Sequence, residues 1–130
     1  MKNIISITLI LILPLCIYFL LNKNSTDNVV IASNSNLPSI VTFSSSMCLD
    51  CQKLKKVLVD VEKEYNNRVN FISVDASSNN KVVKEKIKKH KVVLVPTMIF
   101  LDINGIEKKK IEGYIPKEEL IVEIEALTNG

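Results

Sequence analysis

The hydrophobic residues of this chain follow two patterns, one at the N-terminus and another in the rest of the sequence. Residues 4–21 carry no charge and are mostly Ile and Leu. From residue 37 onward, short apolar runs alternate with stretches whose apolar residues recur every three or four positions, which is typical of alternating strands and helices. Residues 22–36 are rich in Asn and Ser, as flexible linkers are. The chain is therefore predicted to contain an N-terminal anchor (1–21), a polar linker (22–36) and one domain (37–130).

The apolar N-terminal segment predicts a membrane anchor. Its 18 uncharged residues, 4–21, reach the lower length limit of a spanning helix and exceed the usual core of a signal peptide. Two alternatives are weaker: a signal peptide cleaved after Val30–Ala32, far beyond the core, and a lipoprotein box at Leu13–Cys16 that contains the large Leu15. Lys2 precedes the span, a bias that leaves the N-terminus in the cytoplasm. We predict a single-pass protein of a bacterial cytoplasmic membrane with an extracytoplasmic C-terminal domain.

The domain is predicted to alternate strands and helices. Asn104-Gly105 marks a hairpin turn, and Pro116 followed by acidic residues marks a helix start. In the linker, Val29–Ala32 is a candidate for an additional edge strand. The first helix has an apolar face formed by Cys51, Leu54, Leu58, Val61 and Tyr65. The predicted elements are the strand Ser39–Phe43, the helix Cys48–Tyr65, the strand Val69–Val74, a helix near Asn80–Lys89, the hairpin, and the helix Pro116–Leu127.

Cys48 and Cys51 stand where a predicted strand gives way to the first predicted helix. At a helix start, Cys48 meets unpaired backbone N–H groups and the positive end of the helix dipole, which favour the thiolate over the thiol. The thiolate is the form that attacks disulfides. Cys51 lies one turn further along, close enough to close a ring with Cys48. The pair therefore predicts a dithiol that cycles between reduced and oxidised forms.

Two other roles of this Cys-x-x-Cys motif stay open but are less favoured. A structural zinc site commonly needs four Cys or His ligands, and the chain offers only Cys16 and His90 besides the pair. A purely structural disulfide across so short a loop removes little entropy from the unfolded chain. We therefore expect no metal ion and no organic cofactor. His90 is interpreted as a favourable contact with a helix dipole, with proton donation near the thiols as the weaker alternative.

The charge of the chain argues against one class of partner. A net charge of +3 from 17 basic and 14 acidic residues is too small to imply nucleic-acid binding, and the chain has no Trp to stack on bases. The lysines are unevenly distributed, however. We interpret their main cluster as a solvated helix face, with attraction to anionic lipid headgroups as the alternative. The cluster consists of Lys81, Lys84, Lys86, Lys88, Lys89 and Lys91.

Residues 37–130 resemble the thioredoxin family. The order of strands and helices agrees, and Pro96-Thr97 matches the cis-proline and threonine that lie opposite the Cys-x-x-Cys motif in that family. Gly113 matches the family's glycine after the last strand. The resemblance implies an α/β fold with a central mixed β-sheet flanked by helices, preceded here by the N-terminal transmembrane helix. It also implies a cis Val95–Pro96 bond beside the cysteines.

Three positions depart from the family pattern. Met47 replaces the usual Trp before the first cysteine, and Leu49-Asp50 replaces Gly-Pro between the cysteines. Thr42 replaces the buried acid six residues before Cys48. Because a hydroxyl cannot serve as the base that the acid provides, the proton of the second thiol must leave by another route. Leu49 and Asp50 are expected to tune the redox potential, and Met47 to affect the range of substrates.

The resemblance implies a thiol–disulfide oxidoreductase in which Cys48 attacks and Cys51 resolves the mixed disulfide. Val95-Pro96-Thr97 and Met47 are predicted to bind substrate, with the Val95 backbone free to pair with an extended segment. The expected substrates are protein disulfides or dithiols outside the cytoplasmic membrane, reduced with electrons from a membrane donor. The alternatives are a non-catalytic thioredoxin-like binding module and a dedicated single-partner component of a maturation or export pathway.

Overall fold

The computed structural model describes residue 1, residues 12–14 and residues 36–130. Except for residues 12–14, the predicted span 4–21 lies outside the described residues, and so does the candidate strand Val29–Ala32. In the described part of the chain, no helix combines the length and the apolar character needed to cross a membrane.

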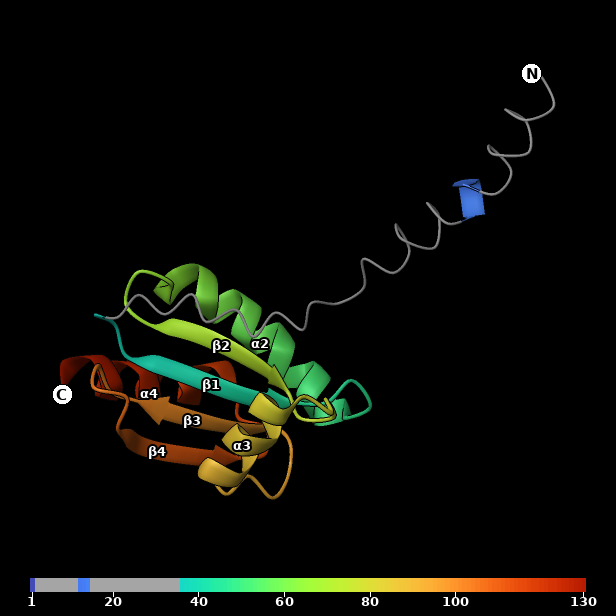
Figure 1. Cartoon of the computed structure of the whole chain (residues 1–130). Helices are drawn as coiled ribbons and strands as arrows, with labels where there is room; N and C mark the ends of the chain where they lie inside the picture. Colours follow the sequence, from blue (N-terminus) through green and yellow to red (C-terminus); the bar gives the residue numbers. More distant parts are fainter. Residues whose placement is uncertain (2–11, 15–35) are drawn as a thin grey trace.

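A four-stranded mixed sheet forms the centre of the domain (Figure 1). The strands, in sheet order, are β2 (Asn70–Asp75), β1 (Ser39–Ser44), β3 (Thr97–Leu101) and β4 (Glu107–Glu112). The first pair is parallel, and the other two pairs are antiparallel. Three helices pack on the sheet: α2 (Leu49–Tyr65), α3 (Lys81–Lys89) and α4 (Lys117–Asn129). The predicted α/β fold with a mixed sheet flanked by helices is confirmed.

The sheet separates two hydrophobic cores because neighbouring side chains of a strand point to opposite faces. In β1, Ile40 packs with α2 and α4, whereas Val41 and Phe43 pack with α3. Figure 1 shows α4 and α3 on opposite sides of the sheet. The first core consists of Ile40, Leu54, Val61, Val69, Met98, Phe100, Ile115, Leu120 and Ile124. The second consists of Val41, Phe43, Ile72, Val74, Val83 and Ile99.

The predicted boundaries are close to those observed. The first helix begins at Leu49 rather than Cys48, because Cys48 has extended backbone angles (φ −94°, ψ 117°) and is the N-cap. The second strand begins at Asn70, since the N–H of Val69 is still bonded to the carbonyl of Tyr65 in the turn that follows α2. The last helix extends to Asn129. These shifts leave every predicted element of the domain in place.

Two turns direct the chain toward the end of the sheet where the cysteines lie. The hairpin turn has Gly105 at φ +74°, and Asp102 Oδ1 accepts the backbone N–H groups of Asn104 and Ile106 at 2.9 Å each. The N–H of Ile106, together with Lys108, lowers the pKa of Asp102. At the end of α3, Lys91 has φ +49°. This left-handed residue ends the helix and sends the chain into the Val92–Val95 loop.

The end of α4 is held against the end of α2 by one arginine. The two terminal nitrogens of the Arg68 guanidinium donate to the Glu125 carboxylate at 2.9 and 3.0 Å, and one of them also donates to the Thr128 hydroxyl at 2.8 Å. The guanidinium carbon lies 5.5 Å from the centre of the Tyr65 ring. The hydrogen bonds from Arg68 lower the pKa of Glu125. The cluster thereby joins two helices that are distant in sequence.

Replacing Glu125 with glutamine is expected to make the free energy of unfolding decrease less steeply as the pH is lowered. Because the pKa of Glu125 is lowered in the folded protein, its carboxylate contributes stability that is complete above the pKa of the unfolded chain. That contribution is lost as the pH falls through the lower, folded pKa. Urea unfolding of wild type and Glu125→Gln from about pH 7 to about pH 3 measures the difference, which solvent screening keeps modest. The exposed Glu62, changed to Gln, is the control. If the free energy of unfolding decreased as steeply with falling pH in Glu125→Gln as in wild type, the expectation would be contradicted.

Candidate active site

A short turn after β1 places Cys48 near the carboxyl ends of β1 and β2. The backbone N–H of Cys48 donates to the carbonyl of Ser45 at 3.2 Å. The Gln52 side chain returns from α2 and donates to the carbonyl of Ser46 at 3.1 Å. The turn is therefore fixed from both ends, and Cys48 stands at the start of α2.

The sulfur of Cys48 serves as the helix cap that an oxygen of Ser, Thr, Asp or Asn usually provides. The backbone N–H of Cys51 donates to Cys48 Sγ at 3.1 Å, and the N–H of Gln52 donates to the Cys48 carbonyl at 3.2 Å. A hydrogen bond from an N–H group and the positive end of the helix dipole both stabilise negative charge on the sulfur. The N–H of Cys51 is thus a specific hydrogen-bond donor that would favour the predicted thiolate of Cys48.

The two cysteines form a disulfide and differ in exposure. The bond joins Cys48 to Cys51 across a Cα–Cα distance of 5.2 Å, inside the range that a disulfide bridges without backbone movement. Cys48 is partly exposed, whereas only 4% of Cys51 is accessible. Cys48 is therefore the more accessible residue of the pair.

The segment Val95-Pro96-Thr97 lies opposite Cys48, as predicted. The Val95–Pro96 bond is cis, which confirms the expectation from the family resemblance. The carbonyl oxygen of Val95 lies 3.7 Å from Cys48 Sγ. Pro96 and Thr97 are buried, and the Thr97 hydroxyl donates to the carbonyl of Leu94 at 2.7 Å. The threonine therefore holds the loop that faces the sulfur.

Gly113 fixes the same loop from the other side. Its N–H donates to the carbonyl of Pro96 at 2.8 Å. Its φ of +97° is unfavourable for residues with a side chain, although a Cβ would meet no atom within 4 Å. The glycine is thus required by its backbone conformation rather than by lack of space.

Exposed apolar side chains occur next to Cys48 in the sequence and in the loop that faces it. Met47 is 92% and Leu49 is 74% exposed, so both sequence-predicted residues are accessible beside Cys48. Val93, which is 86% exposed, and Leu94 were not predicted. Their only signal in the sequence is the run of four apolar residues before Pro96, which is also typical of a buried strand. The structure shows a loop instead.

Three further residues that the sequence singled out, Asp50, Thr42 and His90, make contacts with residues other than the two cysteines. Asp50 is exposed, and its carboxylate binds Lys53 at 3.1 Å. Thr42 is buried in β1, where it pairs with residues of both neighbouring strands. The ring of His90 packs on Phe43, and its Nδ1 lies 2.9 Å from the Glu107 carboxylate. Within the described part of the chain, neither cysteine is a contact of His90.

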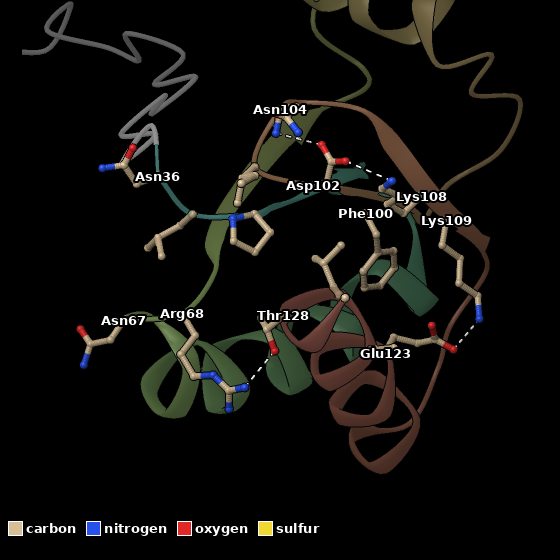
Figure 2. Close-up of a pocket in the computed structure, with 16 residues that line it drawn as sticks. Asn36, Asn67, Arg68, Phe100, Asp102, Asn104, Lys108, Lys109, Glu123 and Thr128 are labelled. Carbon is tan, nitrogen blue, oxygen red and sulfur yellow. Dashed lines mark hydrogen bonds and ion pairs between the residues drawn. The ribbon is translucent and has the colours of Figure 1, made fainter.

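A surface hollow lies at the end of the sheet opposite to the cysteines (Figure 2). It has a volume of about 920 Å³ and is lined by the segment before β1, the β3–β4 turn and the end of α4. Its charged side chains bind each other, as Asp102 does with Lys108 and Lys109 with Glu123. Within residues 36–130 and the few described before them, no group of three or more potential ligands is arranged for a metal ion.

Comparison with known proteins agrees with this geometry. A model of the thioredoxin-like domain family matches residues 26–128. The chloroplast thioredoxin-like protein HCF164 of Oryza sativa subsp. japonica is 29% identical over 110 residues, which are 85% of this chain and 41% of that protein. The thiol:disulfide interchange protein DsbD of Campylobacter jejuni (strain RM1221) is 33% identical over 90 residues, 68% of this chain and 16% of that protein. The chain thus spans less than half the length of these relatives.

Among solved structures, oxidised thioredoxin O2 from Arabidopsis thaliana superposes with a TM-score of 0.62 at 26% identity, covering 77% of this chain and 83% of that one. The fold and the disulfide-bonded Cys-x-x-Cys pair are those of a thioredoxin-like domain. The chain belongs to the thioredoxin-like domain family, whose model matches most of its length.

Proposed function

We propose that this protein is a membrane-tethered thiol–disulfide oxidoreductase that reduces protein disulfides on the outer side of a bacterial cytoplasmic membrane. The observation that carries the chemistry is the asymmetry of the dithiol. Cys48 is partly exposed and caps α2, whereas Cys51, to which it is bonded, is buried. An accessible nucleophile and a protected resolving thiol are what a two-step exchange requires.

The reaction begins when the Cys48 thiolate attacks one sulfur of a client disulfide. A bond forms between Cys48 Sγ and that sulfur, the client S–S bond breaks, and the other client sulfur leaves as a thiolate that takes a proton from water. The Cys51 thiol then gives its proton to water and attacks Cys48 Sγ, which breaks the mixed disulfide and releases the second client sulfur as a thiolate that takes a proton from water. The client gains two electrons and two protons, and the protein keeps the Cys48–Cys51 disulfide.

The Val95 loop would position the client for this attack. It is held by the Thr97 hydroxyl and by the N–H of Gly113, so its shape does not depend on the client. An extended client segment that pairs with the Val95 backbone would pass over Cys48 and between the exposed Met47 and Val93. A preformed surface of this kind lowers the entropy cost of binding.

The location and the electron source rest on the sequence and on the relatives. The uncharged segment 4–21 and the preceding Lys2 support a span with the domain outside. One relative is a thiol:disulfide interchange protein, which supports exchange with other proteins. An extracytoplasmic reductase needs electrons from the membrane, so we propose a dithiol-relaying membrane protein as the donor that restores the reduced pair.

An iodoacetamide derivative that cannot cross membranes is expected to label Cys48 first. In a Cys16→Ser background, reduced cells are treated at about neutral pH, and peptide mass spectrometry compares the two remaining cysteines. Labelling should favour Cys48, because its sulfur is exposed and receives the N–H of Cys51. Preferential labelling of Cys51 would overturn the assigned roles. Labelling only after cell lysis would overturn the location and leave the chemistry intact.

A further inference from the structure

Six lysines beside the active site form a surface that disulfide exchange does not require. The α3 lysine surface comprises Lys81, Lys84, Lys86, Lys88, Lys89 and Lys91. Within the described residues none of the six binds a carboxylate, although six of the other eight lysines of residues 36–130 do. The domain therefore has enough acidic residues to pair with lysines, but within the described residues the lysines of this surface have none as ion-pair partners.

The charge of the domain is strongly polarised. Residues 81–91 contain six lysines and one glutamate, a net charge of +5. The rest of residues 36–130 contains nine basic and twelve acidic residues, a net charge of −3. Such a concentration of one sign creates a field that attracts partners of the opposite sign and raises their rate of association.

The α3 lysine surface is connected to the loop that faces Cys48 through a small apolar pocket. Ile87 of α3 lines this pocket together with the Val92–Val95 loop, and the volume is about 340 Å³. Val95 belongs to both features, since its carbonyl oxygen lies 3.7 Å from Cys48 Sγ. The full lining is Ser45, Ala76, Ser77, Ile87, Val92, Val93, Leu94 and Val95.

We propose that the α3 lysine surface selects clients with acidic segments. In this arrangement an apolar side chain of the client enters the Ile87–Val95 pocket while Cys48 attacks the neighbouring disulfide. Acidic residues further along the client then lie against α3. This inference deepens the proposed function and rests on it. A client polypeptide fits both parts of the surface, since it supplies an apolar side chain and carboxylates from one extended segment.

A lipid membrane is the competing occupant of α3. A membrane that lay against α3 would also cover the pocket that Ile87 shares with Val92–Val95. Val95 of this pocket has its carbonyl oxygen 3.7 Å from Cys48 Sγ. Lipid bound there would obstruct the clients of the reaction. The position of the lysines therefore favours an acidic polypeptide.

Three synthetic peptides test the proposal on the full chain in a Cys16→Ser background. Each contains one internal disulfide with a leucine beside a cysteine, and the flanking residues are Glu, Gln or Lys. At low ionic strength, the reduced protein should react with the Glu peptide about tenfold faster than with the Lys peptide. The ratio should approach one in high salt, which shortens the Debye length. Comparing ratios removes any change in the reactivity of Cys48 itself.

The matched variants move the same charge on different helices. Lys84→Glu/Lys88→Glu should abolish or reverse the preference for the Glu peptide. Lys55→Glu/Lys56→Glu changes the net charge equally on α2, where both lysines are exposed and have no ion-pair partner in the described part of the chain. It should keep the wild-type ratio. Circular dichroism melts verify that both variants fold.

Each other outcome identifies which proposal fails. Equal rates for the three peptides, or equal losses of preference in both variants, would overturn the inference and leave the oxidoreductase intact. No reduction of any peptide would overturn the proposed function itself. The rate of reduction of the Gln peptide is also measured in vesicles of phosphatidylcholine with or without phosphatidylserine. If phosphatidylserine lowered this rate for wild type but not for Lys84→Glu/Lys88→Glu, α3 would bind lipid instead.

Discussion

Replacing Cys48 with serine is expected to abolish disulfide reduction, whereas replacing Cys51 with serine is expected to trap the client. Without the Cys48 thiolate the pair retains only Cys51, which is 4% exposed and therefore poorly accessible to a client. The rate of insulin reduction should therefore fall by about 10³-fold or more, as in other enzymes that lose their nucleophile. Without Cys51 the first step proceeds and the second cannot, so a mixed disulfide at Cys48 accumulates.

Non-reducing electrophoresis followed by mass spectrometry detects the trapped species. The Cys51→Ser variant should carry adducts that dithiothreitol removes, and Cys48→Ser should carry none. The double variant Cys48→Ser/Cys51→Ser is the background control, and Cys16→Ser is present in all three to remove the third thiol. Adducts at Cys51 in Cys48→Ser, as abundant as those at Cys48 in Cys51→Ser, would contradict the assigned order of attack.

The same experiment separates three interpretations of the site. An enzyme of broad range reduces insulin and traps many proteins through Cys51→Ser. A dedicated component of one pathway traps a single protein. A binding module without turnover gives no insulin reduction and no adduct, although the disulfide can still form. The identity of a trapped protein would also show whether its cysteines lie within acidic segments.

The fold was largely predictable because its elements have local signals. The apolar face from Cys51 to Tyr65 and the turn residue Gly105 each determine nearby backbone through periodicity or a positive φ. Element ends were less predictable, since they depend on single hydrogen bonds. Cys48 lies outside the helix because its sulfur accepts the N–H of Cys51, and a cysteine is not a common cap.

The candidate site was predictable only at positions where reactive or conformationally special residues form a recognisable motif in the sequence. Cys48, Cys51 and Pro96 have a characteristic spacing in the chain, and the family resemblance placed them opposite each other. Val93 was missed because its exposure follows from the end of α3, where Lys91 takes a left-handed conformation that ordinary residues seldom adopt. The pocket beneath Val93 joins four separate segments. Such a combination depends on packing and has no local signal.

The redox potential of the Cys48–Cys51 pair is expected to lie near that of a reducing thioredoxin. A strong oxidant of this family stabilises its reduced form through an unusually stable thiolate. Here the N–H of Cys51 lies 3.1 Å from Cys48 Sγ in the disulfide form, and the same contact would stabilise the thiolate of the reduced form. The carbonyl oxygen of Val95 presents the negative end of its dipole 3.7 Å from the same sulfur and opposes this effect. Asp50 adds a negative charge two residues away, which Lys53 partly offsets at 3.1 Å.

Equilibration of the full chain with Cys16→Ser in glutathione buffers measures this potential. We expect a value nearer about −270 mV, the level of thioredoxin, than about −120 mV, the level of a strong periplasmic oxidant. The two levels differ by about 10⁵-fold in the equilibrium constant, since about 30 mV corresponds to tenfold. Because Asp50 is exposed and paired, Asp50→Asn should raise the potential by less than about 30 mV, and Asp60→Asn on the same helix is the control. A wild-type value above about −180 mV would exclude the reducing role and favour an oxidase or isomerase.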